Sequence, residues 1–428
     1  MEVFMKKVLA LLLTVAMSVA CLSTLAACGG GEKADPVAAL ITLHGESSTY
    51  DKNFIDAFKT ACANKGLKKS QYTIAVNIPE GDACYNKAAD FADKGYKAIF
   101  ADSFGHEDYM IKAAKEFTNV NFYHATGTKA HTEGLANFHN AFASIYEGRY
   151  LAGYAAGLKL NTMKDKAVEN NFQVGYVGAY TYAEVISGYT SWFLGLQAAL
   201  DEGYTATMEV QFTGEWYDET GELSAANTLI ERGAVLVSQH ADSMGAPTAC
   251  ADANVPNVSY NGSTGKDNLV AYSKINWVPY FEMMIDEALG NGTVPTDYCG
   301  GLEDGSVVWD LGPNVAEGTL EKVKAVEAEL KAGTRQVFDC SKFTVTVRPF
   351  GTNGEDDFGL NPNATVDNDG HLTGYMADVN TDPAYTGDTE VVKTVGSTTY
   401  FAESESGKRS APYFDIQIDR IYLLNTKF

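Results

Sequence analysis

Hydrophobic and polar positions alternate between two kinds of segment over most of this 428-residue chain. Short apolar runs are each followed by a longer stretch in which apolar residues recur three or four positions apart. The first pattern predicts buried strands and the second predicts amphipathic helices. Because strands and helices alternate along the chain, we expect parallel βαβ units with right-handed crossovers.

The first such unit lies at residues 37–62. Val37 to Leu43 forms an apolar run, a polar loop with Gly45 follows, and an amphipathic helix begins near Asp51. In α/β sheets, ligands bind at the carboxyl ends of the strands, where helix N-termini present unpaired N–H groups. The stretch between the strand and the first turns of this helix is therefore where we first expect a binding site.

The same alternation occurs in two successive runs, which predicts two similar lobes. A Gly- and Ala-rich helix, expected at 146–160, separates the runs and suits close helix packing. In the first run, strands are expected at 73–78, 96–103 and 120–126, and helices at 83–94 and 107–117. In the second run, strands are expected at 172–179, 205–212, 234–239 and 257–261, and helices at 183–200, 222–232 and 244–253.

The remaining elements are less regular. A helix at 280–288 and a strand at 306–311 could belong to either lobe, and a helix at 320–331 ends before Gly333, as a C-terminal glycine predicts. Alternating residues predict strands at 343–347 and 415–424. Between them, residues 353–370 are crowded with Asn, Asp and Gly, which predicts loops.

The N-terminus has the pattern of a secretory signal. Lys6 and Lys7 precede an apolar run, and small residues lead to Cys28, which predicts a signal peptide at 1–27. The apolar run is shorter than the roughly 20 residues of a transmembrane helix. The Leu-Ala-Ala-Cys ending resembles a bacterial lipobox, which implies a lipid on Cys28 that holds the protein at the outer face of the cytoplasmic membrane. Residues 28–36 are expected to form a flexible tether.

Composition narrows the class further. The chain is 45% apolar and 20% charged, as in soluble globular proteins, and its length suits two domains. Its net charge of −23 predicts repulsion from nucleic acid and anionic lipid headgroups. The cysteines after Cys28 allow one or two disulfides but lack the spacing of a metal site. Asp367 to Gly370 resembles a calcium loop, but Met376 stands where a glutamate is required, so an ordinary turn is expected.

No local motif predicts catalysis. The chain lacks a Gly-x-Ser-x-Gly elbow, a phosphate-binding Gly-x-x-x-x-Gly-Lys loop and a His-Glu-x-x-His pair. Acidic residues are so numerous that a chance pair of carboxylates is expected. We therefore predict no enzyme and no cofactor, and we expect no metal.

The expected strand ends instead combine aromatic and polar side chains. Aromatic faces opposed by hydrogen-bonding groups suit a flat heterocycle that bears hydroxyls. The residues concerned are His44, Glu46 and Phe54 after the first strand, Asp102, Ser103 and Phe104 after the third, and Trp216 and Asp242 in the second lobe.

Five short pieces of sequence carry a family resemblance. They are TYDKNF at 49–54, EGRYLAG at 147–153, VGYVG at 174–178, WYD at 216–218 and QHADS at 239–243. In this order, from about Val37 to Phe338, they resemble the basic membrane protein (Bmp) family of lipoproteins, which bind purine nucleosides for ABC importers. The resemblance implies the type I periplasmic-binding fold, with two Rossmann-like doubly wound parallel-sheet lobes and a hinge.

The resemblance also implies how the chain is divided. The N-terminal lobe would comprise residues 37–142 and about 263–300, and the C-terminal lobe residues 143–262 and about 301–345. Residues 346–428 would form an extension that packs on the lobes.

Carried over from the family, Phe54 would stack on the base from the first lobe, and Tyr189 or Trp192 from the second. The chain departs from the family at His44 and Asn261, where many members have Asp, and at Asn53, which replaces Ser. A modified nucleoside, a free base or another small polar ring therefore stays open. The groups implied for the ribose and base edges are Asp102 or Ser103, Asp108, Asp242, Asn261 and Lys274.

These observations predict a monomeric, lipid-anchored solute-binding protein that closes on a nucleoside-like ligand and delivers it to an ABC permease. Two alternatives stay open. One is an extracellular enzyme that hydrolyses nucleosides or sugars, with Asp102, Asp242 or Glu46 as acid or base. The other is a sensor that presents its ligand to a membrane receptor, because one fold can serve several functions.

Overall fold

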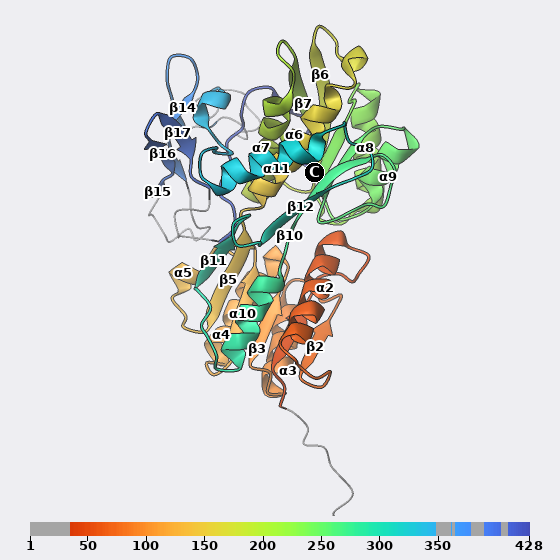
Figure 1. The fold of residues 1–428 in the computed structure, drawn as a ribbon. Coiled ribbons are helices and arrows are strands. Elements are labelled where there is room, and N and C mark those ends of the chain that lie inside the picture. Colours follow the sequence, from red (N-terminus) through yellow and green to blue (C-terminus); the bar gives the residue numbers. More distant parts are fainter. Residues whose placement is uncertain (1–34, 348–360, 362–363, 378–388, 404–409) are drawn as a thin grey trace, which may run out of the picture.

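The computed structural model describes residues 35–347, 361, 364–377, 389–403 and 410–428. The chain folds into two lobes, each built around a sheet, that are joined near the middle of the molecule (Figure 1). The expected signal peptide, Cys28, most of the tether and most of the loop-rich stretch 353–370 lie outside the described residues. Within them, no helix has both the length and the apolar character needed to span a bilayer.

The first lobe contains a six-stranded parallel sheet in the order β11-β5-β4-β3-β1-β2. Helices α2 (Thr49–Asn64) and α10 (Val278–Ala288) cover one face, and α3 (Asp82–Asp93) and α4 (Glu107–Glu116) cover the other. The strands are β1 (Ala38–Ile41), β2 (Tyr72–Ala75), β3 (Ala98–Ala101), β4 (Asn121–Ala125), β5 (Phe138–Ala143) and β11 (Asp297–Gly300). Short helices η1 (Phe104–His106) and α5 (Ala130–Glu133) lie in its loops.

The second lobe contains a seven-stranded sheet in the order β12-β10-β9-β8-β6-β7-β18, parallel except for β12. Its strands are β6 (Asn171–Gly178), β7 (Thr205–Phe212), β8 (Val237–His240), β9 (Asn257–Tyr260), β10 (Leu269–Ile275), β12 (Val307–Leu311) and β18 (Ile421–Leu423). Its helices are α6 (Ile145–Leu160), α7 (Ala183–Ala199), α8 (Glu219–Glu231), α9 (Gly245–Asp252) and α11 (Thr319–Lys331), with the short η2 (Lys164–Lys166).

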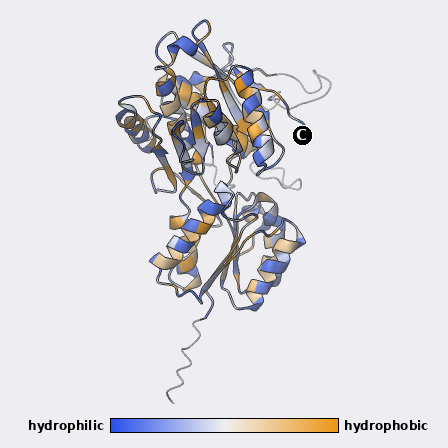
Figure 2. Cartoon of the chain, turned by 90° about the vertical axis from the view of Figure 1, so that its right-hand side faces the viewer, coloured by the Kyte–Doolittle hydropathy of each residue, from blue (hydrophilic) through white to orange (hydrophobic). Residues whose placement is uncertain are grey.

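Both sheets are therefore covered on both faces, which confirms the expected doubly wound α/β architecture. In the second lobe α6 and α7 pack on one face of the sheet, and α8 and α9 pack on the other. The flanking helices carry both hydrophobic and hydrophilic faces (Figure 2). Strands buried on both sides have near-continuous apolar sequences, and these short apolar runs are the pattern that predicts most of the strands.

Several elements escape the sequence pattern. Strand β5 reads Phe-His-Asn-Ala-Phe-Ala, and its polar side chains are buried because they find partners: His139 contacts the carbonyl of Pro295 at 3.1 Å, and the Asn140 amide donates to Glu107 at 2.9 Å. Strands β10 and β11 and the short helix α5 are also unpredicted. Conversely, residues 343–347 form no strand, and the strand expected at 415–424 is reduced to β18.

The expected division of the lobes needs one correction. Residues 263–300 are predicted in the first lobe, but β10 lies in the second sheet because it pairs in parallel with β9 and antiparallel with β12. Only α10 and β11 of this stretch join the first lobe. Within residues 35–347 the chain therefore passes between the sheets three times: after β5, after β10 and after β11.

The C-terminal part packs mainly on the second lobe. Strand β18 extends the second sheet beside β7, and Phe414 stacks on Phe338 with ring centroids 4.3 Å apart. The Asp367 carboxylate accepts the backbone N–H groups of Asp369 and His371, which makes an ordinary turn, as expected. The small strands and last short helix are β13 (Ala364–Val366), β14 (Leu372–Ala377), β15 (Thr389–Glu390), β16 (Val392–Val395), β17 (Thr398–Phe401) and η3 (Cys340–Lys342). The five described cysteines are free thiols.

Phe54 belongs to the core of the first lobe, which corrects the expectation that it stacks on a ligand. Its side chain is fully buried and stacks on Trp277, with ring centroids 4.4 Å apart. Phe100 and Phe281 also contact its ring, at centroid distances of 5.7 and 6.5 Å. The ring therefore joins α2, β3 and α10 and has no face left for a solute.

Helices α6 and α7 cross at backbone contact. A Cβ added at Gly153 would overlap the carbonyl of Trp192, and one added at Gly195 would overlap the carbonyl of Tyr150. Both glycines are required because no side chain fits between the helices.

We predict that Gly153→Ala lowers the free energy of unfolding by about 1–3 kcal/mol, because the added methyl group must push the helices apart. Urea denaturation measures this change. Gly292→Ala is the matched control: its nearest neighbour, the Asp286 Cβ, would lie 3.9 Å from the added atom, so stability should stay unchanged. Equal stability of the two variants would contradict this account of the crossing.

We predict that Phe54→Ala lowers the free energy of unfolding by about 3–5 kcal/mol, the usual effect of removing a buried aromatic ring. Leu320→Ala, at a position that is 50% exposed, should change stability by no more than about 0.5 kcal/mol. Thermal unfolding of both variants provides the measurement. A loss below about 1 kcal/mol at Phe54 would show that its ring is not part of the core.

Candidate functional site

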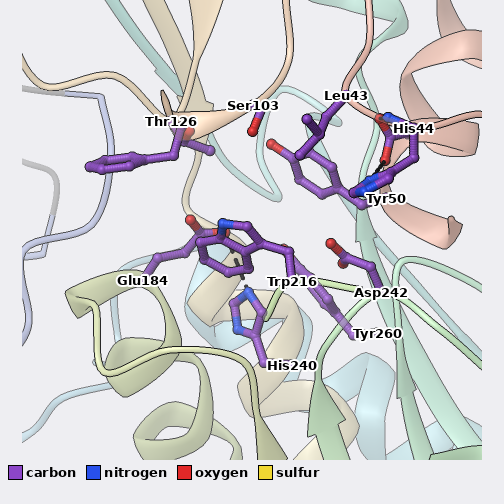
Figure 3. Close-up of a pocket in the computed structure, with 12 residues that line it drawn as sticks. Leu43, His44, Tyr50, Ser103, Thr126, Glu184, Trp216, His240, Asp242 and Tyr260 are labelled. Carbon is purple, nitrogen blue, oxygen red and sulfur yellow. Dashed lines mark hydrogen bonds and ion pairs between the residues drawn. The ribbon is translucent and has the colours of Figure 1, made fainter. Parts of the chain in front are cut away.

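The carboxyl ends of the two sheets face each other across a cavity. The first lobe contributes the loops after β1, β3 and β4 and the start of α2, and the second contributes the start of α7 and the ends of β7, β8 and β9 (Figure 3). The carboxyl edge of such sheets is where α/β proteins bind ligands. The lining residues are Leu43, His44, Tyr50, Asp51, Ser103, Phe104 and Thr126 from the first lobe and Glu184, Trp216, His240, Asp242 and Tyr260 from the second.

The cavity is nearly closed in this structure. It measures about 20 Å³ within about 400 Å³ of space free of protein atoms. Ligand pockets typically measure about 300–1,000 Å³. Because the walls come from different lobes joined by three chain crossings, a ring-sized ligand would enter after the lobes separate.

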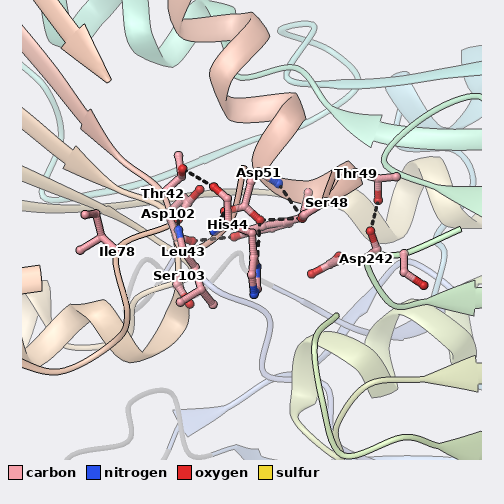
Figure 4. A network of polar contacts seen from close by, with 12 residues as sticks. Thr42, Leu43, His44, Ser48, Thr49, Asp51, Ile78, Asp102, Ser103 and Asp242 are labelled. Atoms are coloured by element: carbon pink, nitrogen blue, oxygen red, sulfur yellow. Dashed lines mark hydrogen bonds and ion pairs between the residues drawn. The ribbon is translucent and has the colours of Figure 1, made fainter. Parts of the chain in front are cut away.

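The first-lobe wall is organised by the Asp51 carboxylate at the start of α2 (Figure 4). It accepts the His44 backbone N–H at 2.7 Å and the hydroxyl of Ser48, the N-cap of α2, at 2.6 Å. Burial alone would raise the pKa of Asp51, but the hydrogen bonds from His44 and Ser48 outweigh it and hold the pKa below its ordinary value. Asp51 thus keeps its charge and fixes the loop that carries His44.

Asp102 supports this wall from behind. One carboxylate oxygen accepts the Leu43 N–H at 3.1 Å, and the Asp102 carbonyl accepts the Tyr50 hydroxyl at 2.8 Å. Burial, together with the charge of Asp51, raises the pKa of Asp102 well above its ordinary value. Asp102 therefore holds the Tyr50 ring in the cavity wall rather than lining the cavity itself.

The second-lobe wall combines a carboxylate–imidazole pair with a second buried acid. His240 Nε2 lies 3.3 Å from Glu184 Oε1, and burial lowers the pKa of His240, so the imidazole is neutral at neutral pH. Burial also raises the pKa of Asp242 well above its ordinary value, with smaller effects from nearby acids including Asp51. This wall can accept hydrogen bonds from a ligand and offers little positive charge.

A buried guanidinium lies under the second-lobe wall. Arg149 is fully buried, donates to the Gln239 carbonyl at 2.8 Å, and contacts the Tyr176 hydroxyl. Its guanidinium carbon lies 4.8 Å from the centroid of the Tyr260 ring, a cation–π contact. Burial lowers the pKa of Arg149 to about 10. Arg149 is thus still charged at neutral pH and packs against the ring of Tyr260 without lining the cavity itself.

Two hydrogen bonds from Thr49 join the lobes beside the cavity. The Thr49 N–H and hydroxyl, at the start of α2, donate to the Asp242 carbonyl at 2.9 and 3.1 Å. The Asp242 N–H in turn donates to the Trp216 carbonyl at 2.9 Å. These bonds set the distance between Tyr50 on one wall and Trp216 on the other.

The chemistry of the lining favours an uncharged ring with hydrogen-bond donors. Aromatic side chains come from both lobes, and the charged groups are mostly carboxylates. Aromatic faces hold a planar ring, and carboxylates accept hydrogen bonds from hydroxyl and amine groups. The described residues contain no cluster of three His, Cys, Asp or Glu side chains that could hold a metal ion.

The structure places five of the expected site residues in the lining: His44, Ser103, Phe104, Trp216 and Asp242. Their part in binding stays a prediction. Three others, Asn53, Asn261 and Lys274, line a separate cavity of about 330 Å³ on the far side of the start of α2. There the Asn53 amide donates to the Ile275 carbonyl at 2.7 Å.

Besides Phe54 and Asp102, four expected site residues lie outside both cavities. Glu46 is 58% exposed and pairs with Lys59, and Asp108 is 67% exposed and pairs with Lys129. Tyr189 and Trp192 are buried on α7, and the Tyr189 hydroxyl donates to Gln417 at 2.8 Å. The exposed acids are solvated and paired, and the α7 aromatics fill the core, so neither pair can contact a ligand in the cavity.

Tyr50, Thr126, Glu184, His240 and Tyr260 line the cavity without having been predicted as site residues. The sequence could have indicated Tyr50, because this residue lies one helical turn before Phe54, inside the matching TYDKNF piece. His240 and Tyr260 are the last residues of β8 and β9, where a ligand is expected. Glu184 in the first turn of α7 has no distinguishing pattern.

Two relatives resemble this chain in sequence. One, from Haloferax volcanii, carries the provisional name ABC transporter glucose-binding protein TsgA13 and is 30% identical over 280 residues, which cover 64% of this chain and 66% of that protein. The other, purine-binding protein BAB2_0673 from Brucella abortus, is 28% identical over 273 residues, 63% of this chain and 73% of its own length.

Solved structures confirm the fold. An ABC transporter solute-binding protein from Conexibacter woesei superposes with a TM-score of 0.55 at 19% identity, over 70% of this chain and 98% of that one. A solute-binding protein from Aeropyrum pernix superposes with a TM-score of 0.57 at 12% identity, over 74% of this chain and 95% of that one.

The profile of the Bmp family, described as PnrA-like ABC transporter substrate-binding proteins, matches residues 44–336. Since the match spans most of the chain and both lobes, the protein belongs to the Bmp family of ABC transporter substrate-binding proteins.

Proposed function

We propose that this protein binds a purine nucleoside or a closely related ring between its lobes and delivers it to an ABC importer. The observation that carries the proposal is the cavity at the facing ends of the two sheets, with aromatic and carboxylate side chains on both walls. The purine-binding name of the Brucella relative agrees with this chemistry.

The ring would lie between Tyr50 of the first lobe and Trp216 of the second. Figure 3 shows the Trp216 indole reaching into the space between the two sets of lining residues. Stacking of a base on an aromatic side chain is worth about 1–3 kcal/mol. The acids at the edges, Glu184 and Asp242, would accept hydrogen bonds from amino and hydroxyl groups.

A hexose is the second candidate. The Haloferax relative carries the name of a glucose-binding protein, and a small cavity lined by carboxylates also suits a sugar. Aromatic side chains contact the apolar face of a sugar ring as readily as a base. The two candidates share an uncharged ring with several donors and differ in whether it is aromatic.

Binding would close the lobes because a ligand that contacts both walls stabilises the closed state by its differential contacts.

We further propose that the mature chain is a monomer with a lipid on Cys28 that holds it outside the cytoplasmic membrane. A hydrolytic enzyme and a receptor-coupled sensor are the alternatives. Incubation with nucleosides separates the first, because a binding protein returns its ligand unchanged, and recovery of a permease with the protein separates the second.

We predict that isothermal titration calorimetry detects binding of adenosine, inosine or guanosine, and that Trp216→Ala weakens it by roughly 1–3 kcal/mol because the stacking face is lost. Trp309→Ala, on β12 and outside the cavity, is the matched control and should keep the wild-type affinity. Mass spectrometry of small molecules released on denaturation provides an independent identification.

Three outcomes would contradict the proposal. Unchanged affinity of Trp216→Ala would remove the indole from the binding site. Binding of glucose with no response to any nucleoside would replace the nucleoside with the hexose. Release of free base from a nucleoside would assign the protein to the enzymes.

A further inference from the structure

A second, outer cavity adjoins the one between the lobes. It measures about 420 Å³ and shares Leu43, His44, Phe104 and Trp216 with the inner cavity. Because four residues line both spaces, side chains rather than backbone separate them. The two cavities are therefore adjacent, and a ligand that spans both would contact the shared side chains.

The partition between the cavities is an aromatic contact across the lobes. Phe104 of the first lobe and Tyr182 of the second are stacked, with ring centroids 5.3 Å apart and planes inclined by 29°. Tyr182 is 45% exposed, and its ring also contacts Tyr180 and Trp216, at centroid distances of 5.3 and 6.0 Å. Rotation of these side chains would join the two spaces.

The outer cavity has its own binding chemistry. Tyr180, Tyr182 and Tyr217 add aromatic faces, and Glu80 and Glu215 add carboxylates. Glu80 already accepts the Ser103 hydroxyl at 2.6 Å and the Gly105 N–H at 2.9 Å, both through one oxygen. Glu215 is exposed, and its one side-chain contact in the described structure is the Tyr180 hydroxyl at 3.5 Å. Both acids therefore keep oxygen atoms for further donors.

The charge of this lining selects among ligand classes. It includes no lysine or arginine, so a phosphate group would face two carboxylates and no fixed cation. An uncharged ring with hydroxyl groups instead gives the acids donors and gives the tyrosines an apolar face. A sugar ring has both features.

We propose that the outer cavity is a second binding subsite, which holds an uncharged sugar ring linked covalently to the unit in the inner cavity. The inference rests on the proposed function, since it needs a ligand in the inner cavity. It extends the ligand to a two-ring compound, either a nucleoside with a second sugar or a disaccharide. The inner unit decides between these two sources.

The test compares single-ring and two-ring probes by calorimetry on the full chain. Adenosine is paired with 2′-O-ribosyladenosine, and glucose with maltose. In the pair whose single-ring probe binds the inner cavity, the two-ring probe should bind wild-type protein about tenfold more tightly than the single-ring probe. Glu215→Gln should remove most of that gain, because a hydrogen bond to a charged group becomes a neutral one, and should leave the affinity for the single-ring probe unchanged.

Glu321→Gln is the matched control. Glu321 is an exposed glutamate on α11 that lines neither cavity, so this variant should keep the tenfold gain. Glu215 is itself exposed, so the variant should fold. If the single-ring probe binds and the two-ring probe gains nothing, the outer subsite is overturned and the proposed function stands. If no probe of either pair binds, the proposed function is overturned and the inference with it.

Discussion

The hydrogen bonds from Thr49 to the carbonyl of Asp242 are the contact on which the arrangement of the site depends. They connect the first turn of α2 in one lobe to the loop after β8 in the other, at 2.9 and 3.1 Å. Tyr50 and Asp51 follow Thr49 directly, so the same turn that touches the second lobe also presents the first-lobe wall. Separation of the lobes would therefore break this contact and take the cavity apart at the same time.

The cost of burying acids explains why such a cavity should hold a ligand with donors. Asp102 and Asp242 are buried with pKa values raised well above their ordinary range, whereas Asp51 keeps a lowered pKa because its partners are built into the loop. A buried carboxylate without enough donors is unstable in the charged form. Hydroxyl or amino groups of a ligand would supply donors to the Asp242 carboxylate, for which the described residues show no donor. Without a ligand, separation of the lobes would let water solvate the Asp242 carboxylate. Burial of this acid therefore favours the open state of the unliganded protein.

The sequence predicts the architecture well because the physical signal is strong. Strands covered on both faces are continuous apolar runs, and amphipathic helices between them leave few alternatives to a doubly wound sheet. Strand β5 escapes because His139 and Asn140 are satisfied by partners distant in sequence, Pro295 and Glu107, which no local pattern reveals. The residues of β10 are not predicted as a strand and are expected in the first lobe, since only their pairing with β9 and β12 decides their sheet.

The site is less predictable than the fold because it depends on which side of a helix meets the other lobe. Tyr50 and Phe54 lie one turn apart on α2, and both are aromatic residues of the same matching piece. Periodicity places them on one face but does not say where the core ends and the cavity begins. The structure places that boundary between them: the Phe54 ring stacks on Trp277, while the Tyr50 hydroxyl bonds to the Asp102 carbonyl.

The C-terminal part accounts for the other displaced aromatic. Strand β18 pairs with β7, so an edge that would otherwise present unpaired backbone groups is covered. Gln417, a few residues before β18, accepts the Tyr189 hydroxyl and donates to the Ile421 carbonyl, each at 2.8 Å. Tyr189 thus joins α7 to a segment beyond the region that matches the family. Because Tyr189 is fully buried on α7, the aromatic side chains that the second lobe presents to the cavity are instead Trp216 and Tyr260, at the strand ends.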